Sequence, residues 1–410
     1  RALSNEDLRL KYRFLDLRRP AMARNMQIRH RVTKTTRDYL DEHGFLEIET
    51  PILSKSTPEG ARDFLVPSRL APGKFYALPQ APQQYKQLLM VAGMERYFQI
   101  ARCFRDEDLR ADRQLEFTQV DIEASFITPE DIYNLVEGLL KRVYKESLGV
   151  DIPTPFPRMT WKEAMDQYGS DKPERRFGMK LTDVSSIFEN SGFKVFASAV
   201  SNGGVVKAIN AKGFGSASVG QIDALTKTAV EAGAKGLAYI KVREEDWRSP
   251  ISKFLSDEEK QKLTEALDIE TGDLVLFAAG PWEPSCDILG RVRLQCAEFM
   301  ELLKDNKERD FLWVIEFPLV GWDEEEQRWV AIHHPFTRPV KEDEQKLLSG
   351  ELSADLRAQA YDVVLNGTEL GGGSIRIHER DLQSAMFKAL GITEAQAREP
   401  FGHILDAFSF

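Results

Sequence analysis

The chain has 410 residues, of which 42% are hydrophobic and 29% charged, a mixture typical of a globular protein with roughly two to four domains. No apolar run approaches the roughly 18 residues of a membrane-spanning helix, and the first residues lack the pattern of a secretory signal. The three cysteines show no paired spacing and are too few for a disulfide framework. We therefore expect a soluble, cytoplasmic protein with reduced cysteines.

The net charge of −10 argues against a protein that coats nucleic acid indiscriminately. Residues 9–37 nevertheless carry a basic stripe with one acid, Asp16. Its ten basic members are Arg9, Lys11, Arg13, Arg18, Arg19, Arg24, Arg29, Arg31, Lys34 and Arg37. Such a stripe is either a solvated helix face or a nucleic-acid contact, and composition leaves both interpretations open.

The first half of the chain predicts two helices and three strands. Helical spacing of apolar residues ends at Gly44 in one case and at Gly149 in the other, where glycine favours a helix terminus. The strands show period-two alternation of apolar and polar residues. The helices are expected at residues 24–43 and 128–149, and the strands at 45–50, 96–104 and 116–123.

The second half changes in character. Residues 176–307 alternate helical and strand patterns without an obvious catalytic constellation, which indicates an inserted domain. Strands are expected there at 237–242 and 274–279. Strand-like runs return at 311–320 and 329–332.

The strongest local signal for chemistry is a charged hairpin. Arg105, Asp106 and Glu107 follow the strand at 96–104, and the loop returns to the next strand through Gln114. An arginine fixed at a strand end can hold a phosphate through two hydrogen bonds, while carboxylates and amides order a nucleotide. Taken alone, such residues more often form only a salt-bridged hairpin loop.

Three further segments accompany this hairpin. They read Thr-Pro-Glu-Gly-Ala at 57–61, Gln-Ala-Pro-Gln-Gln-Tyr-Lys at 80–86 and Glu-Leu-Gly-Gly-Gly-Ser-Ile-Arg-Ile-His at 369–378. With these residues the chain resembles the bacterial-type aspartyl-tRNA synthetases, members of the second structural class of these ligases. The resemblance covers essentially all 410 residues.

The resemblance implies an α+β fold, an antiparallel sheet flanked by helices. The strand at 45–50 with its preceding helix would be the first class motif, at a homodimer interface, and the Arg105 hairpin would be the second. The implied parts are a hinge at 1–23, a catalytic domain at 24–175 and 308–410, and an insertion at 176–307. The insertion would be of the type shared with a subunit of bacterial amidotransferases.

The resemblance also assigns roles to residues. Glu59, Gln83 and Asp121 would surround the ammonium group of aspartate, Lys86 and Arg376 its side-chain carboxylate, and His333 would lie on a nearby loop. Arg105 would act catalytically by bridging the α-carboxylate and the α-phosphate, and Asp106, Glu107, Gln114 and Glu369 would contact ATP. Asp362 and Glu369 would bind Mg²⁺, which prefers oxygen ligands, while Arg110 and Arg113 would touch tRNA.

The implied reaction is the ATP-dependent activation of L-aspartate followed by its transfer to tRNA(Asp), with tRNA(Asn) left open as a second acceptor. A sister ligase for asparagine or lysine, or a tRNA-free amino-acid ligase on the same fold, is disfavoured because Lys86 and Arg376 present two cations to the side chain. A catalytically dead paralogue that only binds RNA is the other alternative.

Two motifs invite other interpretations. The triple glycine after Glu369 fits no phosphate-binding P-loop, and we expect either a close backbone approach or a bulged strand. His333 and His334 have no third ligand at zinc spacing. The resemblance further implies that an anticodon-binding barrel precedes residue 1 and that the third class motif follows residue 410, so we expect this polypeptide to show little ATP–pyrophosphate exchange.

Overall fold

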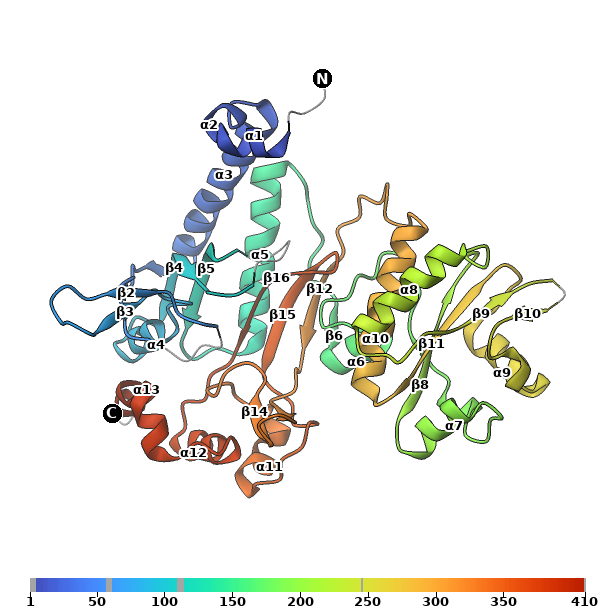
Figure 1. Ribbon diagram of the computed structural model, residues 1–410. Coiled ribbons are helices and arrows are strands. Elements are labelled where there is room, and N and C mark those ends of the chain that lie inside the picture. Colours follow the sequence, from blue (N-terminus) through green and yellow to red (C-terminus); the bar gives the residue numbers. More distant parts are fainter. Residues whose placement is uncertain (1–4, 57–60, 109–113, 245, 409–410) are drawn as a thin grey trace. The chain divides into compact units, whose positions relative to one another are not determined.

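The computed structural model describes residues 5–56, 61–108, 114–244 and 246–408. The chain divides into two compact units (Figure 1). The first unit comprises Arg1–Phe156, Leu319–Leu356 and Ile375–Phe410, and the second comprises Pro157–Pro318 and Arg357–Ser374. Both contain helices and mainly antiparallel strands, so the α+β class expected from the sequence is confirmed.

The first unit begins with three helices, α1 (Glu6–Lys11), α2 (Arg13–Asp16) and α3 (Pro20–Glu42). Proline at the first position of α3 loses no hydrogen bond, because that N–H has no partner within a helix. Gly44 follows α3 with φ of 76°, a left-handed conformation that glycine adopts without strain. The predicted helix is therefore confirmed.

A three-stranded sheet has the order β1-β4-β5, formed by β1 (Leu46–Glu47), β4 (Arg96–Phe104) and β5 (Glu116–Ala124). The β4 and β5 strands are antiparallel as expected, whereas β1 is parallel to β4. The predicted strand at 45–50 is too long. Its ladder stops because the Gln99 side chain accepts hydrogen bonds from the Thr50 amide and hydroxyl, at 3.3 and 2.9 Å.

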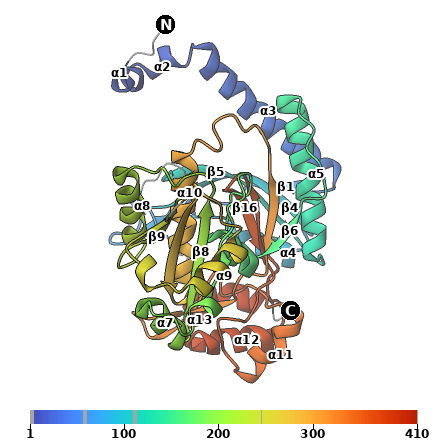
Figure 2. The same cartoon turned by 90° about the vertical axis from the view of Figure 1, so that its right-hand side faces the viewer.

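Helix α5 (Pro129–Leu148) lies beside α3, as Figures 1 and 2 show. It starts with a capping box between Thr128 and Asp131 and ends at left-handed Gly149. A buried cluster joins the two helices to the sheet. Its members are Tyr39, Leu40, Phe45, Phe98 and Leu139, each of which stabilises the fold by about 1.5 to 3 kcal/mol on burial.

The remaining parts of the first unit are short. They are β2 (Leu65–Pro67), β3 (Phe75–Ala77), α4 (Gln83–Val91), β13 (Val320–Asp323), β14 (Arg328–Ala331), α11 (Glu344–Ser349), α12 (Arg380–Ala389), α13 (Glu394–Ala407) and a 3₁₀ turn at Lys341–Asp343. Aromatic residues of α12 and α13, Phe387 and Phe401, pack around Phe336. This cluster contacts Leu88 of α4 and so connects the C-terminal helices to the residues that follow β3.

The second unit contains a five-stranded sheet with the order β10-β9-β11-β8-β7. The strands are β7 (Thr182–Asp183), β8 (Val205–Ala211), β9 (Ala238–Val242), β10 (Trp247–Arg248) and β11 (Leu274–Gly280), which confirms the two predicted here. Along β11, Leu274 and Leu276 join one apolar cluster while Val275 and Phe277 join another. Alternate residues therefore bury both faces of the sheet.

Helices cover this sheet. Residues of α8 and α10 belong to one cluster, and residues of α7 and α9 to the other. Their bounds are α7 (Lys194–Ser201), α8 (Val219–Glu231), α9 (Asp257–Leu267) and α10 (Trp282–Phe299), with 3₁₀ turns at Ser185–Ile187 and Ser252–Phe254. The alternation of helical and strand patterns seen in the sequence is thus one sheet with helices on both faces.

A four-stranded sheet of the second unit has the order β16-β15-β12-β6, accompanied by α6 (Trp161–Tyr168). Its strands are β6 (Arg158–Thr160), β12 (Phe311–Ile315), β15 (Ala360–Leu365) and β16 (Thr368–Ser374). The strand predicted at 311–320 ends early, because Glu316 has φ of 56° and breaks the extended backbone. No helix in the described part of the chain is long and apolar enough to cross a membrane.

Candidate functional site

A buried ion cluster joins α4 to β5 in the first unit. The Lys86 Nζ lies 2.7 Å from Asp121 Oδ1 and 3.2 Å from Glu123 Oε2. Burial opposes the charged lysine, but the two carboxylates outweigh it and hold the pKa of Lys86 above its ordinary value. Lys86 is therefore a permanent cation, held by residues that lie on the same face of β5 because they are two apart.

Arg376 approaches the same helix. Its Nη2 donates a hydrogen bond of 2.9 Å to Gln83 Oε1, and its charge acts on Lys86. In the described part of the chain, Gln83 Nε2 and Asp121 Oδ2 are buried without a hydrogen-bond partner. Because unpaired buried polar atoms cost about 1 to 3 kcal/mol, they mark a place where a ligand can supply the missing bonds.

His334 belongs to this cluster. Burial, together with the charges of Arg376 and Lys86, lowers the pKa of His334 to about 3, so the imidazole is neutral at physiological pH. Its Nδ1 accepts a hydrogen bond of 3.1 Å from the Phe336 amide, which leaves the proton on Nε2 as a donor. The ring stacks on Phe336, with centroids 5.3 Å apart.

The resemblance implies a role for His333, which is exposed, whereas the half-buried His334 beside it was not predicted as a site residue. Glu123 was not predicted as a site residue either. The period-two alternation of β5 contained the signal for Glu123, since a residue two positions from Asp121 shares its face. No comparable periodicity separates the two histidines, because both follow the end of β14.

The Arg105 hairpin forms the adjacent end of the β4–β5 ladder. The Arg105 amide donates to the Leu115 carbonyl at 2.9 Å, and its guanidinium carbon lies 5.1 Å from the centre of the Phe117 ring. This stacking fixes a planar group with parallel donors, the arrangement suited to a phosphate or carboxylate. Asp106 extends the hairpin, since its amide donates to the Arg62 carbonyl at 3.1 Å.

The other predicted residues of this region are less defined. Glu107 is half-buried and Gln114 is exposed, and both flank the loop between the strands. Glu59, Arg110 and Arg113 lie outside the described residues. Their assignments remain predictions.

The second unit carries the predicted magnesium ligands. Asp362 lies on β15 and Glu369 on its antiparallel partner β16. The turn between these strands is Asn366-Gly367, with φ of 52° and 74°. Asn-Gly is the usual signal of a tight hairpin turn, but no hairpin was predicted from it in the sequence.

The triple glycine makes room for one of these carboxylates. A Cβ on Gly372 would lie 2.0 Å from Asp362 Oδ1, so only glycine permits the approach. The pairing of β15 and β16 also shifts register between Val363 and Val364. The bulge expected as one alternative is therefore present. The close approach seen here is between Gly372 and the Asp362 carboxylate, and an approach of this backbone to a bound substrate stays a prediction.

The electrostatics of Asp362 are those of an uncompensated acid. Burial and the nearby Glu369 and Asp171 raise the pKa of Asp362 to about 8, although Lys172 opposes the rise. The described residues contain no group of three or more metal-ligating side chains. Two carboxylates nevertheless fit Mg²⁺, which commonly takes one or two from the protein and completes its shell with phosphates and water.

Comparisons with known proteins identify the family of this chain. The model of the tRNA synthetases class II (D, K and N) family matches residues 5–410. The chain belongs to this family of class II synthetases. A curated relative from Opitutus terrae, named aspartate-tRNA(Asp/Asn) ligase, is 59% identical over 411 residues, covering 99% of this chain and 69% of the relative.

Two other class II synthetases show similar agreement. The Bacillus subtilis protein, also named aspartate-tRNA(Asp/Asn) ligase, is 58% identical over 407 residues, with 99% of this chain and 68% of the relative covered. The Geobacillus kaustophilus protein is named aspartate-tRNA ligase and is 58% identical over 406 residues, with the same coverage of 99% and 68%. The names of these relatives thus differ in whether they include tRNA(Asn) beside tRNA(Asp).

Proposed function

We propose that the protein is an aspartate-tRNA ligase. Membership of the class II synthetases and relatives at 56 to 59% identity support the reaction class. The observation that carries the choice of amino acid is the cluster of Lys86, Arg376 and His334. Two cations and a neutral N–H donor match a carboxylate side chain. Because Lys86 is already paired with Asp121 and Glu123, an amide in place of that carboxylate would leave the half-buried Arg376 without a counter-charge.

The proposed first step joins aspartate to the nucleotide. The α-carboxylate of aspartate attacks the α-phosphate of ATP, and pyrophosphate leaves. Arg105 bridges the two reacting groups and offsets the negative charge that develops, so the chain contributes positioning and charge rather than a nucleophile. Asp362 and Glu369 would hold a magnesium ion, which supplies positive charge to the phosphates when bound.

In the second step the terminal ribose hydroxyl of tRNA attacks the aspartyl-adenylate and releases AMP. Asp121 and Gln83 keep the aspartyl group oriented through their free oxygen and amide donor. We propose tRNA(Asp) as the acceptor. Relatives named for both tRNA(Asp) and tRNA(Asn) support tRNA(Asn) as a second acceptor.

The test is aminoacylation by the full-length protein. Aspartate-dependent ATP–pyrophosphate exchange and charging of purified tRNA(Asp) are expected, with asparagine and lysine inactive in the same exchange assay. Charging of tRNA(Asn) with aspartate decides whether it is a second acceptor. Exchange that depends on asparagine or lysine instead would overturn the proposal.

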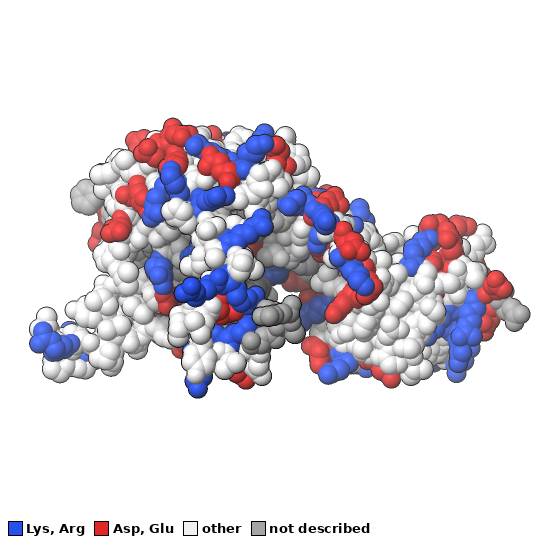
Figure 3. All heavy atoms as spheres, turned by 90° about the horizontal axis from the view of Figure 1, so that it is seen from above, with Lys and Arg blue, Asp and Glu red and all other residues white. Residues whose placement is uncertain are grey.

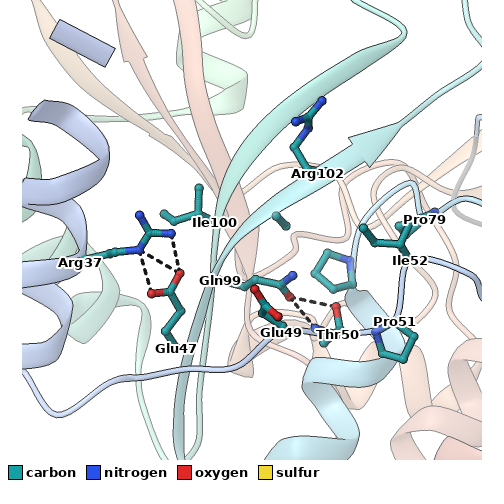
Figure 4. A pocket seen from close by; sticks show the side chains of 12 residues that line it. Arg37, Glu47, Glu49, Thr50, Pro51, Ile52, Pro79, Gln99, Ile100 and Arg102 are labelled. Atoms are coloured by element: carbon teal, nitrogen blue, oxygen red, sulfur yellow. Dashed lines mark hydrogen bonds and ion pairs between the residues drawn. The ribbon is translucent and has the colours of Figure 1, made fainter. Parts of the chain in front are cut away.

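We further propose that the first unit forms a homodimer through its β1 edge. Leu46, Ile52 and Leu53 are large apolar residues with 52%, 47% and 52% of their surfaces exposed. Of these, Ile52 also lines a cavity of about 210 Å³ (Figure 4). Figure 4 shows Arg37 of α3 paired with Glu47 of β1 at its margin, at 2.8 Å.

An apolar edge of this kind is typical of an interface between subunits. Light scattering on the full-length protein should give twice the subunit mass, and Leu53→Asp should give monomers. Leu70→Asp is the matched control, since Leu70 is 82% exposed and lies away from β1 in the sequence. A monomeric wild type would refute the dimer without affecting the assignment of the reaction.

The domain boundaries are also a proposal. We propose a hinge at 1–23, a catalytic domain at 24–175 and 308–410, and an inserted domain at 176–307. The five-stranded sheet with α7 to α10 lies between Thr182 and Phe299, which supports an inserted unit with its own core. The type of insertion, the one shared with a subunit of bacterial amidotransferases, is implied by the resemblance to the aspartyl-tRNA synthetases.

A further inference from the structure

The segment 170–179, which follows α6, lies against the hairpin that carries Asp362 and Glu369. A Cβ on Gly367, in the turn of that hairpin, would lie 3.0 Å from the Glu174 Cβ. Asp171 and Lys172 are also close enough for their charges to act on Asp362. All of these residues belong to the second unit, so one compact body holds the segment and the carboxylate pair together.

A buried arginine of α10 holds this segment. Arg293 is 1% exposed, and its guanidinium donates to the carbonyls of Glu174, Gly178 and Met179 at 2.6, 2.5 and 2.8 Å. The guanidinium carbon also lies 4.0 Å from the centre of the Phe177 ring. Burial without a paired carboxylate lowers the pKa of Arg293 to about 10, yet the side chain remains charged at neutral pH.

Ion pairs fasten the same segment to the β15–β16 turn. Arg175 contacts both oxygens of Asp310, at 2.8 and 2.5 Å, and the Asp310 amide donates to Asn366 Oδ1 at 2.8 Å. Arg176 in turn pairs with Glu174. The segment is therefore attached at one side to α10 and at the other to the hairpin of Asp362.

These hydrogen bonds and ion pairs hold residues 170–179 more firmly than a loop that only connects two elements requires. A buried charge that donates to three carbonyls of one short segment specifies the backbone path of that segment, because removing it would strand those acceptors. The segment contains one lysine, Lys172, and its charge acts on Asp362, one of the two carboxylates that would hold Mg²⁺. A lysine ammonium in that setting serves as a point charge for phosphate oxygens.

We propose that Lys172 is a further phosphate-binding residue and that Arg293 is the positioning residue that holds its segment beside Asp362 and Glu369. The inference rests on the proposed ligase function and deepens it. The positioning role of Arg293 gives the insertion at 176–307 a role in the reaction, because Arg293 lies on α10 of that insertion. The ligand class is a nucleoside triphosphate bound with Mg²⁺.

The first experiment measures binding without turnover. Calorimetric titration of the full-length protein with Mg²⁺ and α,β-methylene-ATP should show about tenfold to hundredfold weaker binding for Lys172→Met. Lys227→Met is the matched control, because Lys227 pairs at 3.7 Å with Glu231 on the surface of α8 and should bind as the wild type does. Aspartate affinity should be unchanged in both variants.

The second experiment tests the positioning role of Arg293. Arg293→Lys keeps the charge but loses the planar fork, so hydrogen exchange of residues 170–179 should accelerate and analogue binding should weaken. Arg291→Lys is the control on the same helix, since Arg291 contacts exposed Asp287 at 3.0 Å. The double variant of Lys172→Met and Arg293→Lys should bind no more weakly than Lys172→Met alone, because both changes remove one interaction.

The outcomes separate the two levels of the proposal. Equal analogue affinity of Lys172→Met and Lys227→Met overturns the binding role of Lys172, even if the wild type catalyses aspartate-dependent exchange. Arg293→Lys that loses stability while analogue affinity stays unchanged reduces Arg293 to a structural residue. If Arg293→Lys does not fold, the analogue affinity of Lys172→Met still tests whether Lys172 binds phosphate. Failure of the wild type to exchange pyrophosphate with aspartate would instead refute the proposed function.

Discussion

Two acidic sites of this molecule differ in how their charge is compensated. In the first unit, Asp121 and Glu123 lie against Lys86, and the cluster is neutralised largely by its own residues. In the second unit, Asp362 and Glu369 lie on the paired strands β15 and β16, and burial together with the Glu369 charge raises the pKa of Asp362 to about 8. The acids of the first site are paired with a cation of the protein, whereas burial and like charge dominate around Asp362 in the second.

This difference predicts unequal responses when charge is removed. A site with internal pairing should lose stability, because the remaining partner is left buried and unpaired. A site with unpaired like charges should gain stability and lose only its ligand. The following predictions test that contrast, starting with the largest expected effect.

Lys86→Met should destabilise the first unit by about 3 to 5 kcal/mol, the usual cost of leaving a buried carboxylate without its cation. Native-state hydrogen exchange of α4 and β5 measures this free energy. The double change Lys86→Met with Asp121→Asn should recover part of the loss. Exposed Lys141 provides the control, and equal effects of Lys86→Met and Lys141→Met would show that the pair is not a stabilising interaction.

Arg376→Leu should reduce the preference for aspartate over asparagine in the full-length protein. In the native site, asparagine would leave a cation without a carboxylate, at a cost of about 2 to 5 kcal/mol. The preference for aspartate that Arg376→Leu removes is therefore roughly thirtyfold to several thousandfold. The relative kcat/KM for the two amino acids in pyrophosphate exchange gives the answer. Arg380→Leu, at the exposed start of α12, should leave the ratio unchanged.

The raised pKa of Asp362 predicts a pH dependence of opposite sign to that of an ordinary ion-paired acid. The folded state binds the proton more tightly than the unfolded state, so stability is full below about pH 4 and declines as pH rises toward about 8. The slope is at most about 1.4 kcal/mol per pH unit. Asp362→Asn should abolish this decline when unfolding is followed across that window.

Mg²⁺ binding should show the complementary trend. A cation must displace the proton of Asp362, so apparent affinity should rise with pH up to about 8 and then level off, by no more than tenfold per unit. Titration of Mg²⁺ with the ATP analogue at several pH values measures it. A Mg²⁺ affinity that does not change with pH would mean that Asp362 is ionised throughout and that Mg²⁺ displaces no proton from it.

The sequence predicted the long helices and the β4–β5 ladder because their periodicity and terminating glycines are local signals. It could not show that Gln99 ends β1, since that contact joins distant residues. Pairing of Lys86 with Asp121 is likewise non-local, and the resemblance supplied the residues without revealing their contact. His334 was missed because its burial depends on Phe336 and Phe401, which tertiary packing brings together.

The basic stripe of the N-terminal helices carries the smallest expected effect. Seen from above, Lys and Arg side chains gather over α1 to α3 with acids among them (Figure 3). Part of the stripe is engaged locally: Arg13 and Arg19 pair with Asp16, at 2.6 and 2.7 Å. No ion pair joins Arg18, Arg24 or Arg31 to another described residue, and all three are exposed.

Those three arginines are therefore the ones expected to meet tRNA phosphates. Changing all three to Gln should lower the slope of log affinity against log salt by about three, roughly one for each lost contact. Affinity for tRNA is measured from low to moderate salt with the full-length protein. The double variant of Arg13→Gln and Arg19→Gln is the comparison. Both side chains pair with Asp16, so their loss should alter helix stability more than the salt slope. An unchanged slope in the triple variant would show that the stripe is a solvated face, the alternative that composition left open.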